Sequence, residues 1–385
     1  MIETVLSDRQ GSAALGRHVR VEDERLSSPF VIILAGGTGT RLWPRSRKQM
    51  PKQLLDIVAK NTMLQATFVR VRPLVSPERI FIVTNDTYAP IVREQLPQLP
   101  VDNIISEPWG HNTAPCIGLA ACYLRHLEPE GIMISVHADH LIDDEEKYRR
   151  GLLAAMEVAV EGYLTTLGAQ PSSPRPGLGY IHRGRLLKRA HGCEIYEIAE
   201  FIEKPGEEQA ERFLATGEYC WNIGSFVWQL PMILREFEKL MPHLYDQLMI
   251  IDAAIGTSEE RLVLERVWQE VADEAIDTGI MERARRAAVV PMDIGWTDIG
   301  SWATVADLLP ADSENNVVVG GEHIGVDTTG TLLYGTTHRL IATMGLKDMI
   351  VVDTDDVLLV CPKDRAQDVK DLVAKLRITN KEEYL

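Results

Sequence analysis

The segment Phe30-Val31-Ile32-Ile33-Leu34-Ala35-Gly36-Gly37-Thr38-Gly39-Thr40-Arg41 joins an unbroken apolar run to a glycine-rich turn that ends in an arginine. A continuous apolar strand is typical of a parallel sheet that helices cover on both faces. Glycines let the backbone approach an anion closely and point successive N–H groups at it. The segment therefore predicts a buried strand that leads directly into an anion-binding turn.

Two later segments repeat this arrangement of an apolar run followed by polar residues. Residues 79–84 precede Asn85-Asp86, and residues 131–136 precede His137-Ala138-Asp139-His140. Helical patterns occupy residues 114–127 and 144–162. Strands that alternate with helices indicate a mainly parallel sheet with helices on both faces. Because ligands bind at the carboxyl ends of such strands, these polar residues are expected to lie at a functional site.

The remaining pattern predicts further elements and a second domain. A loop is predicted at 170–179, a strand at 195–201, a helix from Pro205 onward, and long helices at 231–249 and 258–274. A polar break at 312–316 suits a domain boundary. Beyond it, short apolar runs at 317–320, 332–335, 350–353 and 357–360 indicate a small β-solenoid, with an amphipathic helix at 363–376. We expect a mobile extension at 1–29, one domain over 30–311 and another over 312–385.

The composition is that of an acidic globular protein, with 385 residues, 45% of them hydrophobic, and a formal net charge of −16. This charge disfavours a nucleic-acid-binding surface. No apolar run approaches the roughly 18 residues that cross a bilayer, and residues 1–29 lack the apolar block of a secretory signal. Five scattered cysteines without C-x-x-C spacing are typical of reduced thiols. We therefore expect a cytoplasmic protein with no membrane or nucleic-acid partner.

Positive charge is concentrated between residues 41 and 52, where Arg41, Arg45, Arg47, Lys48 and Lys52 occur without an acid. Such a run usually forms a solvated surface, but this one directly follows the glycine turn and so favours an anion site. The turn is neither a P-loop, which requires G-K-[ST], nor a dinucleotide fingerprint, which requires glycine or alanine at position 42. A triphosphate suits the glycines and the planar guanidinium of Arg41.

The residues Leu34 to Pro44, followed by Pro51-Lys52-Gln53, resemble the signature of the sugar nucleotidyltransferases. Their Leu-Trp-Pro and Pro-Lys-Gln forms look specifically like the mannose-1-phosphate guanylyltransferases. Later segments resemble blocks of the same family in the same order. They are Glu107 to Pro115, His137 to His140, Phe201 to Pro205, Trp221 to Phe226 and Asp293 to Trp302.

This resemblance implies a Rossmann-like nucleotidyltransferase domain with a mainly parallel sheet, followed by a small left-handed β-helix domain that mediates homodimerisation. It also implies attack of mannose 1-phosphate on the α-phosphorus of GTP, which yields GDP-mannose and pyrophosphate. Such catalysis consists mostly of positioning and charge neutralisation and requires no side-chain nucleophile.

A divalent cation, expected to be Mg²⁺, would be bound by Asp139 and Asp298, since this ion prefers carboxylates and keeps several waters. The alternatives are a helix cap for Asp139 and a turn acid for Asp298. His137 and His140 raise the possibility of zinc, but no cysteine or further histidine completes a tetrahedral set, so they are expected to be structural or outer-sphere groups.

The resemblance also implies which residues contact the substrates. Arg41 and Lys52 would hold the β- and γ-phosphates, and Lys204 the sugar phosphate or the α-phosphate. The implied nucleotide-binding residues are Leu34, Ala35, Gly36, Gly37, Thr38, Gly39, Thr40, Glu107, Asn112 and Thr113. The implied sugar-binding residues are Gly179, Glu203 and Asn222. The tryptophans Trp221, Trp228, Trp296 and Trp302 are expected in the core.

Other functions remain open on the sequence. One is a sister enzyme with another nucleotide or hexose phosphate, because His111 replaces a common arginine and Arg175, Pro176 and Leu178 depart from the usual sugar-binding loop. Another is a catalytically silent nucleotide-sugar sensor, which should have lost the charged residues that only chemistry requires. A bifunctional enzyme that also isomerises mannose phosphate would need a further catalytic domain.

Overall fold

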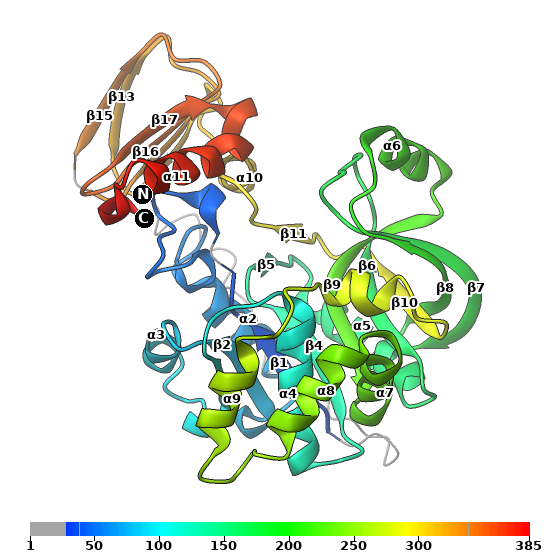
Figure 1. The fold of residues 1–385 in the computed structure, drawn as a ribbon. Helices are drawn as coiled ribbons and strands as arrows, with labels where there is room; N and C mark the ends of the chain where they lie inside the picture. The colour runs from blue at the N-terminus through cyan, green and yellow to red at the C-terminus, as the bar shows by residue number, and fades with distance from the viewer. Residues whose placement is uncertain (1–27, 38, 338) are drawn as a thin grey trace.

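A nine-stranded sheet forms the centre of the larger part of the molecule in the computed structural model, which describes residues 28–37, 39–337 and 339–385 (Figure 1). Its order is β3-β2-β1-β4-β9-β6-β10-β8-β7. The strands are β1 (Phe30–Leu34), β2 (Ile80–Asn85), β3 (Ile104–Glu107), β4 (Ile132–His137), β6 (Leu164–Ala169), β7 (Tyr180–Ala190), β8 (Cys193–Ile202), β9 (Tyr219–Gln229) and β10 (Ala287–Met292). Strands β8 and β9 run opposite to the others, so the sheet is mainly parallel in direction.

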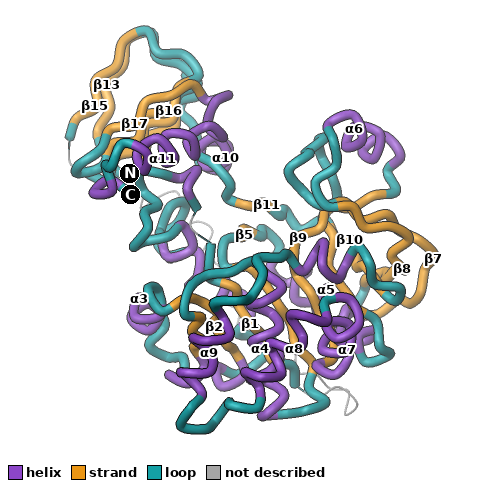
Figure 2. Tube along the Cα trace, viewed as in Figure 1, coloured by secondary structure: helices purple, strands orange, loops and turns teal. Residues whose placement is uncertain are grey.

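Helices cover both faces of this sheet, as the apolar run at 30–35 predicts (Figure 2). Val31 and Ile33 of β1 pack in one core with residues of α2 (Met63–Val71), α3 (Ala89–Gln95) and α5 (Glu145–Ala159). Ile32 and Leu34 pack in a second core with residues of α4 (Thr113–Leu127), α7 (Leu230–Leu240), α8 (Pro242–Asp252) and α9 (Glu260–Trp268). Successive side chains of a strand point to opposite faces, so β1 contributes to both cores.

Two helix predictions are wrong in extent. The pattern at 231–249 forms two helices, because Pro242 has no N–H to continue α7 and instead begins α8. The pattern at 258–274 forms only α9, which ends at Trp268. The helix expected after Pro205 is confirmed as α6 (Glu207–Thr216). The four tryptophans expected in the core are buried.

The C-terminal region folds as short sheets that resemble turns of a β-helix. Strands β12 (Val317–Val319), β14 (Leu332–Gly335) and β16 (Met349–Asp353) pair in parallel, and β17 (Leu358–Pro362) closes this sheet antiparallel to β16. A second parallel pair consists of β13 (Glu322–Val326) and β15 (Leu340–Met344). Helix α11 (Val369–Ile378) lies beside them. The expected solenoid is thus present, with β13 and β15 in addition to the four anticipated strands.

A third core joins this C-terminal region to the segment after the glycine turn. Leu42 and Trp43 pack there with Trp302 of α10 (Trp302–Leu308) and with Leu332 and Ile350. The extension expected at 1–29 lies almost entirely outside the described residues, as does Thr38.

Replacement of Trp302 by alanine should lower the free energy of unfolding by about 3–5 kcal/mol, the usual cost of removing a large buried aromatic side chain. Trp302 is fully buried, packs on Tyr334, and donates a 2.9 Å hydrogen bond from Nε1 to the Trp43 carbonyl. Urea unfolding followed by circular dichroism measures the effect. The matched control is Leu262→Ala on α9, whose side chain is 69% exposed. Equal, small losses in both variants would contradict the third core.

Candidate active site

The carboxyl ends of four neighbouring parallel strands bring the polar residues together at one edge of the sheet. Strand β1 ends at Leu34, β2 at Asn85, β3 at Glu107 and β4 at His137. The backbone beyond these ends remains in contact, because the Ala138 N–H donates to the Leu34 carbonyl at 3.1 Å. The glycine turn and the segment around Asp139 are therefore adjacent.

Hydrogen bonds fix the backbone where the glycine turn follows strand β1. The Ala35 carbonyl accepts hydrogen bonds from Gln53 Nε2 and Thr84 Oγ1, both at 2.9 Å. A Cβ built on Gly36 would meet no described atom within 4 Å, so open space lies before the turn. Gly39 has a φ of 61°, and a Cβ there would lie 2.7 Å from Lys52 Cγ. Glycine at this position therefore allows both the left-handed turn and the close approach of Lys52.

Lys52 and Asp139 form the central ion pair of the site. Lys52, in the 3-10 turn Lys52–Leu54, places its Nζ 2.6 Å from Asp139 Oδ2 and donates to the Ile299 carbonyl at 3.0 Å. Burial raises the pKa of the Asp139 carboxyl, but Lys52, His140 and His137 together hold it well below its usual range. Asp139 is therefore a carboxylate throughout the neutral pH range.

Asp298 is brought to this pair by a short two-stranded sheet. Strand β11 (Thr297–Asp298) pairs with β5 (His140–Leu141), which sets Asp298 opposite His140, next to Asp139 in sequence. Burial raises the pKa of the Asp298 carboxyl, against an opposing effect of Arg175. Its Oδ1 accepts no hydrogen bond from the described residues, and Arg175 Nη2 lies 3.3 Å away as an ion-pair partner. This oxygen can still accept a ligand.

Two imidazoles lie beside the carboxylates. One nitrogen each from His137 and His140 and one oxygen of Asp139 lie within 4.8 Å of one another. Burial lowers the pKa of His137 and lowers that of His140 to about 3, so both rings are neutral at physiological pH. A Cβ on Gly224 would lie 2.6 Å from His137 Nε2, so β9 packs closely on this ring. Both imidazoles, which the sequence raised as possible zinc ligands and then set aside, thus lie with Asp139 in a group of three potential metal ligands.

A second polar cluster lies further along β9, where the residues implied for sugar binding meet. The Asn222 N–H donates to the Gly179 carbonyl at 2.8 Å, and a Cβ on Gly179 would lie 2.5 Å from Glu203 Oε2. Asn222 Nδ2 donates to Asp277 Oδ1 at 2.7 Å. Burial, and then the charge of Glu203, raise the pKa of Asp277 to about 6. Asp277 lies outside every sequence motif, so no local pattern indicates it.

Arg175 connects the two clusters. Besides the contact with Asp298, its guanidinium lies 5.6 Å from the centroid of the Trp221 ring, next to Asn222 in sequence. Its backbone N–H donates to the Tyr180 hydroxyl at 2.9 Å. The departure from the family pattern at position 175 thus places a cation between the paired carboxylates and the second cluster.

Arg41 and Lys204, the other expected phosphate ligands, form fewer contacts within the described part of the chain than Lys52. Arg41 is exposed and forms no ion pair with the described residues. The side chain of Lys204 is 66% exposed and pairs with Glu203 at 2.8 Å, while its backbone φ is 50°. Lys204 therefore lies with the second cluster and is not in contact with Lys52, Asp139 or Asp298.

The 107–113 loop is held both by its own side chains and by hydrogen bonds to the segment 268–276. Buried Glu107 accepts from the His111 N–H at 3.3 Å, and burial raises its pKa to about 7. The Asn112 side chain accepts from the Thr113 N–H, and Thr113 Oγ1 accepts from the Ile276 N–H. The loop reaches the glycine turn at Gly110, where an added Cβ would lie 3.6 Å from the Gly36 carbonyl.

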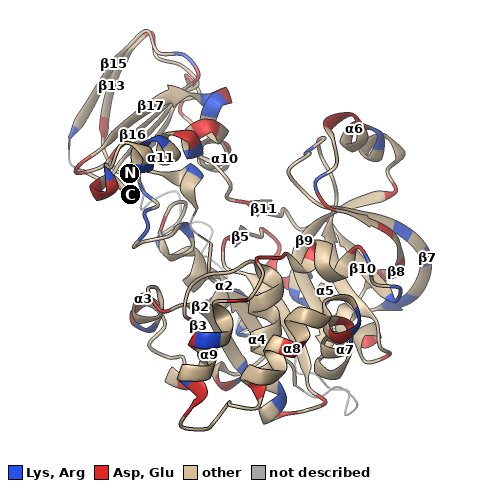
Figure 3. Cartoon of the chain, viewed as in Figure 1, with Lys and Arg blue, Asp and Glu red and all other residues tan. Residues whose placement is uncertain are grey.

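The basic run from 41 to 52 is divided by the fold. Arg45 pairs with Asp56 at 2.6 Å and Arg47 with Asp356 at 2.7 Å, so these two guanidinium groups are engaged in internal contacts. Elsewhere along the described chain, Lys and Arg positions are interspersed with Asp and Glu positions (Figure 3). Among the described helices, none is long and apolar enough to cross a membrane.

Comparison with known proteins agrees with this geometry. A family model for nucleotidyl transferases matches residues 30–315, and one for the MannoseP isomerase/GMP-like β-helix domain matches residues 321–376. The mannose-1-phosphate guanylyltransferase of Klebsiella pneumoniae is 37% identical over 357 residues, which cover 92% of this chain and 75% of that protein. The enzyme of the same name from Escherichia coli (strain K12) is 37% identical over 366 residues, with 93% and 75% covered.

A solved structure extends the match to three dimensions. The crystal structure described as mannose-1-phosphate geranyltransferase from Thermus thermophilus has a TM-score of 0.81 at 31% identity, and the match covers 91% of this chain and 100% of that one. The chain therefore belongs to the nucleotidyl transferase family and, within it, to the mannose-1-phosphate guanylyltransferases.

Proposed function

We propose that this protein transfers GMP from GTP to mannose 1-phosphate, releasing pyrophosphate and forming GDP-mannose. The observation that carries the proposal is the position of Lys52, which packs against Gly39 of the glycine turn and pairs with Asp139. A triphosphate bound along the turn would thus lie near the ammonium group of Lys52 and near the carboxylates of Asp139 and Asp298. The relatives named above carry this activity in their names.

Asp139 and Asp298 are our candidates for binding a divalent cation, and Mg²⁺ is the ion that we propose. Asp139 is ionised, and Asp298 Oδ1 accepts no hydrogen bond from the described residues beside its ion pair with Arg175. These carboxylates fit a hard cation that takes carboxylate oxygens and retains waters. Such an ion would neutralise phosphate charge during the transfer. Asp139 and Asp298 would hold this ion through carboxylate oxygens, and Lys52, which pairs with Asp139, would contact the phosphates.

The substrates are then assigned to the clusters around these acids. Arg41 and Lys52 would neutralise the β- and γ-phosphates of the leaving pyrophosphate. The nucleotide would lie along Leu34 to Thr40 and against the loop that contains Glu107, Asn112 and Thr113. Mannose 1-phosphate would occupy the second cluster, where Gly179, Glu203 and Asn222 contact hydroxyls and Lys204 contacts the phosphate.

Incubation with GTP, ATP, UTP or dTTP, each combined with mannose or glucose 1-phosphate, tests the assignment through pyrophosphate release. We expect the GTP and mannose 1-phosphate pair to give the highest kcat/KM. A sister enzyme would prefer another pair, and a silent sensor would bind GDP-mannose without releasing pyrophosphate from any pair.

The Asp139→Asn variant should lose at least about a thousandfold in kcat, because the carboxylate charge that would bind the cation is absent. Affinity for GTP measured without metal should change much less. Isothermal titration with Mn²⁺ provides a second readout, in which tight metal binding should disappear. The matched control is Asp246→Asn, an exposed acid on α8. Near-normal turnover in the Asp139→Asn variant would exclude the metal assignment.

We also propose that the C-terminal region mediates a homodimer. Strands β13 and β15 expose a face on which Val326 lies opposite Met344 and Ile324 lies opposite Ala342. Leu340 is also exposed on this face, and Met344 is 77% exposed. Contiguous exposed apolar surface of this kind is typical of an interface.

The double variant Ile324→Glu/Met344→Glu should sediment as a monomer, because two carboxylates would have to be desolvated in the interface. Sedimentation velocity at micromolar concentration measures this, with the wild type expected as a dimer. Leu262→Glu is the control, because Leu262 is an exposed residue of α9, outside the C-terminal region. A dimeric double variant would place the interface elsewhere, and a monomeric wild type would refute the dimer itself.

A further inference from the structure

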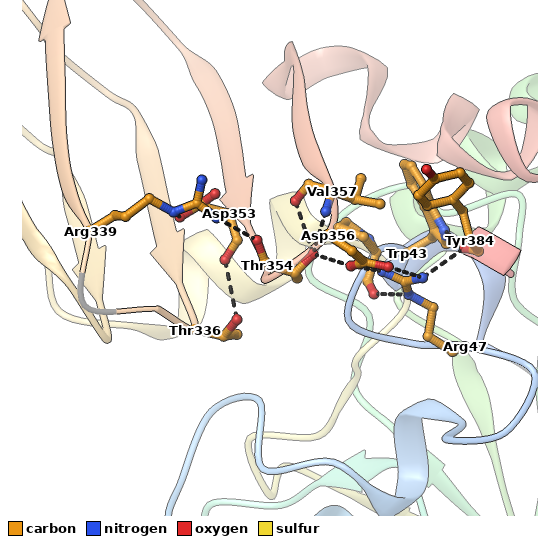
Figure 4. Close-up of polar contacts among 10 residues, drawn as sticks. Trp43, Arg47, Thr336, Arg339, Asp353, Thr354, Asp356, Val357 and Tyr384 are labelled. Carbon is orange, nitrogen blue, oxygen red and sulfur yellow. Dashed lines mark hydrogen bonds and ion pairs between the residues drawn. The ribbon is translucent and has the colours of Figure 1, made fainter.

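Residues of the C-terminal region form hydrogen bonds and an ion pair with the segment between Arg41 and Lys52 (Figure 4). Arg47 donates from Nη2 to Asp356 Oδ1 at 2.7 Å and from Nη1 to Asp356 Oδ2 at 3.2 Å. Its Nη1 also donates to the Tyr384 carbonyl at 2.9 Å, and its Nε donates to the Pro44 carbonyl at 2.5 Å. All three guanidinium nitrogens are therefore occupied.

Trp43 completes this arrangement. Its Nε1 donates to the same Tyr384 carbonyl at 2.7 Å, and its own carbonyl accepts from Trp302 Nε1 at 2.9 Å. We call Trp43, Arg47, Asp356 and the Tyr384 carbonyl the loop clamp. It joins the loop after the glycine turn to the β16–β17 turn and to the segment after α11.

The Asp356 side of the clamp is itself held in place. Thr354 Oγ1 donates towards Asp356 Oδ1 at 3.1 Å, and the Thr354 carbonyl accepts from Arg339 Nη2 at 3.0 Å. Arg339 Nε also lies 3.3 Å from Asp353 Oδ2 (Figure 4). The acceptor for Arg47 thus belongs to a network that extends to the segment before β15.

The loop that the clamp holds is short and internally bonded. The Trp43 N–H donates to the Thr40 carbonyl at 3.3 Å, the Ser46 N–H to the Leu42 carbonyl at 2.9 Å, and the Arg47 N–H to the Met50 carbonyl at 2.9 Å. A displacement of Trp43 or Arg47 must therefore move the backbone on either side, which includes Arg41 and Lys52.

Arg47 and Asp356 differ from an ordinary surface ion pair, which contributes little. The Asp356 side chain is 47% exposed, but that of Arg47 is only 18% exposed, and the planar guanidinium fork of Arg47 donates to the Asp356 carboxylate through two nitrogens. The peptide carbonyls of Pro44 and Tyr384 fix the orientation of the fork. A lysine could supply the charge but not this geometry.

We propose that Arg47 and Asp356 are positioning residues for the triphosphate of GTP, through which the C-terminal β-helix region holds the phosphate-binding loop in its binding conformation. Neither residue contacts substrate. The pair acts through Arg41 and Lys52, so its effect should fall on GTP and spare mannose 1-phosphate, which binds at the second cluster. This inference rests on the proposed function.

The test compares Asp356→Asn and Arg47→Lys with the wild type in steady-state kinetics and in calorimetric titration with GTP. Each variant should raise the KM and Kd for GTP about tenfold, the effect of losing one charge-assisted contact. The KM for mannose 1-phosphate should stay within about twofold, a split that general destabilisation would not produce. The KM and Kd for GTP of the double variant should equal those of Arg47→Lys alone, because both changes disrupt the same ion pair.

Asp307→Asn is the matched control, since it breaks the 2.8 Å pair with Lys363, a contact with the C-terminal region that involves no residue of the loop clamp. Its affinity for GTP should equal that of the wild type. Unchanged GTP affinity in both clamp variants would overturn the proposal, as would equal weakening for both substrates. Failure of the proposed function would appear differently, as a wild-type protein that does not bind GTP.

Discussion

The ion pair between Lys52 and Asp139 is the interaction on which the arrangement of the site depends. It joins two chain segments that are far apart in sequence, and it does so at the point where the ends of β1 and β4 meet. Partial burial makes the pair stronger than a surface contact, and it keeps the carboxylate ionised beside two neutral imidazoles. In the proposed reaction the same two groups would receive opposite partners, Asp139 a cation and Lys52 a phosphate, so the resting pair preserves both charges in a protein that is acidic overall.

The pair keeps its geometry only if the loop that contains Lys52 is rigid. This loop is restrained at both of its ends. On one side, β1 is buried between two helical layers, so the start of the glycine turn is fixed by the packing of Ile32 and Ile33 into opposite cores. On the other side, the loop after the turn is buried in the third core and bonded to the C-terminal region. The C-terminal region thus contributes to the structure of the nucleotide side of the site as well as exposing an apolar face of its own.

Arg175 and Asp277 add two charged groups to the part of the site where we propose that mannose 1-phosphate binds. The guanidinium of Arg175 pairs with Asp298, and Asp277, whose pKa is raised by burial, accepts a hydrogen bond from Asn222. The family resemblance implied neither residue as a sugar ligand. Both residues come from irregular segments, a proline-rich loop and the π-helical turn Asp277–Met281. Local patterns are weakest in such segments, because backbone irregularity removes the periodicity that marks a face.

The sequence alone determined the strands that enter the site, because continuous apolar runs ending in polar residues have few structural solutions. It also indicated the glycine turn, Lys52, Asp139 and the short repeats of the C-terminal region. Only the tertiary structure showed that β6, β7, β9 and β10 extend the sheet, that Pro242 divides a helix, and that Arg45 and Arg47 are engaged in internal ion pairs. The physical reason is distance along the chain: Asp356 lies 309 residues from Arg47, and no local pattern records a partner so far away.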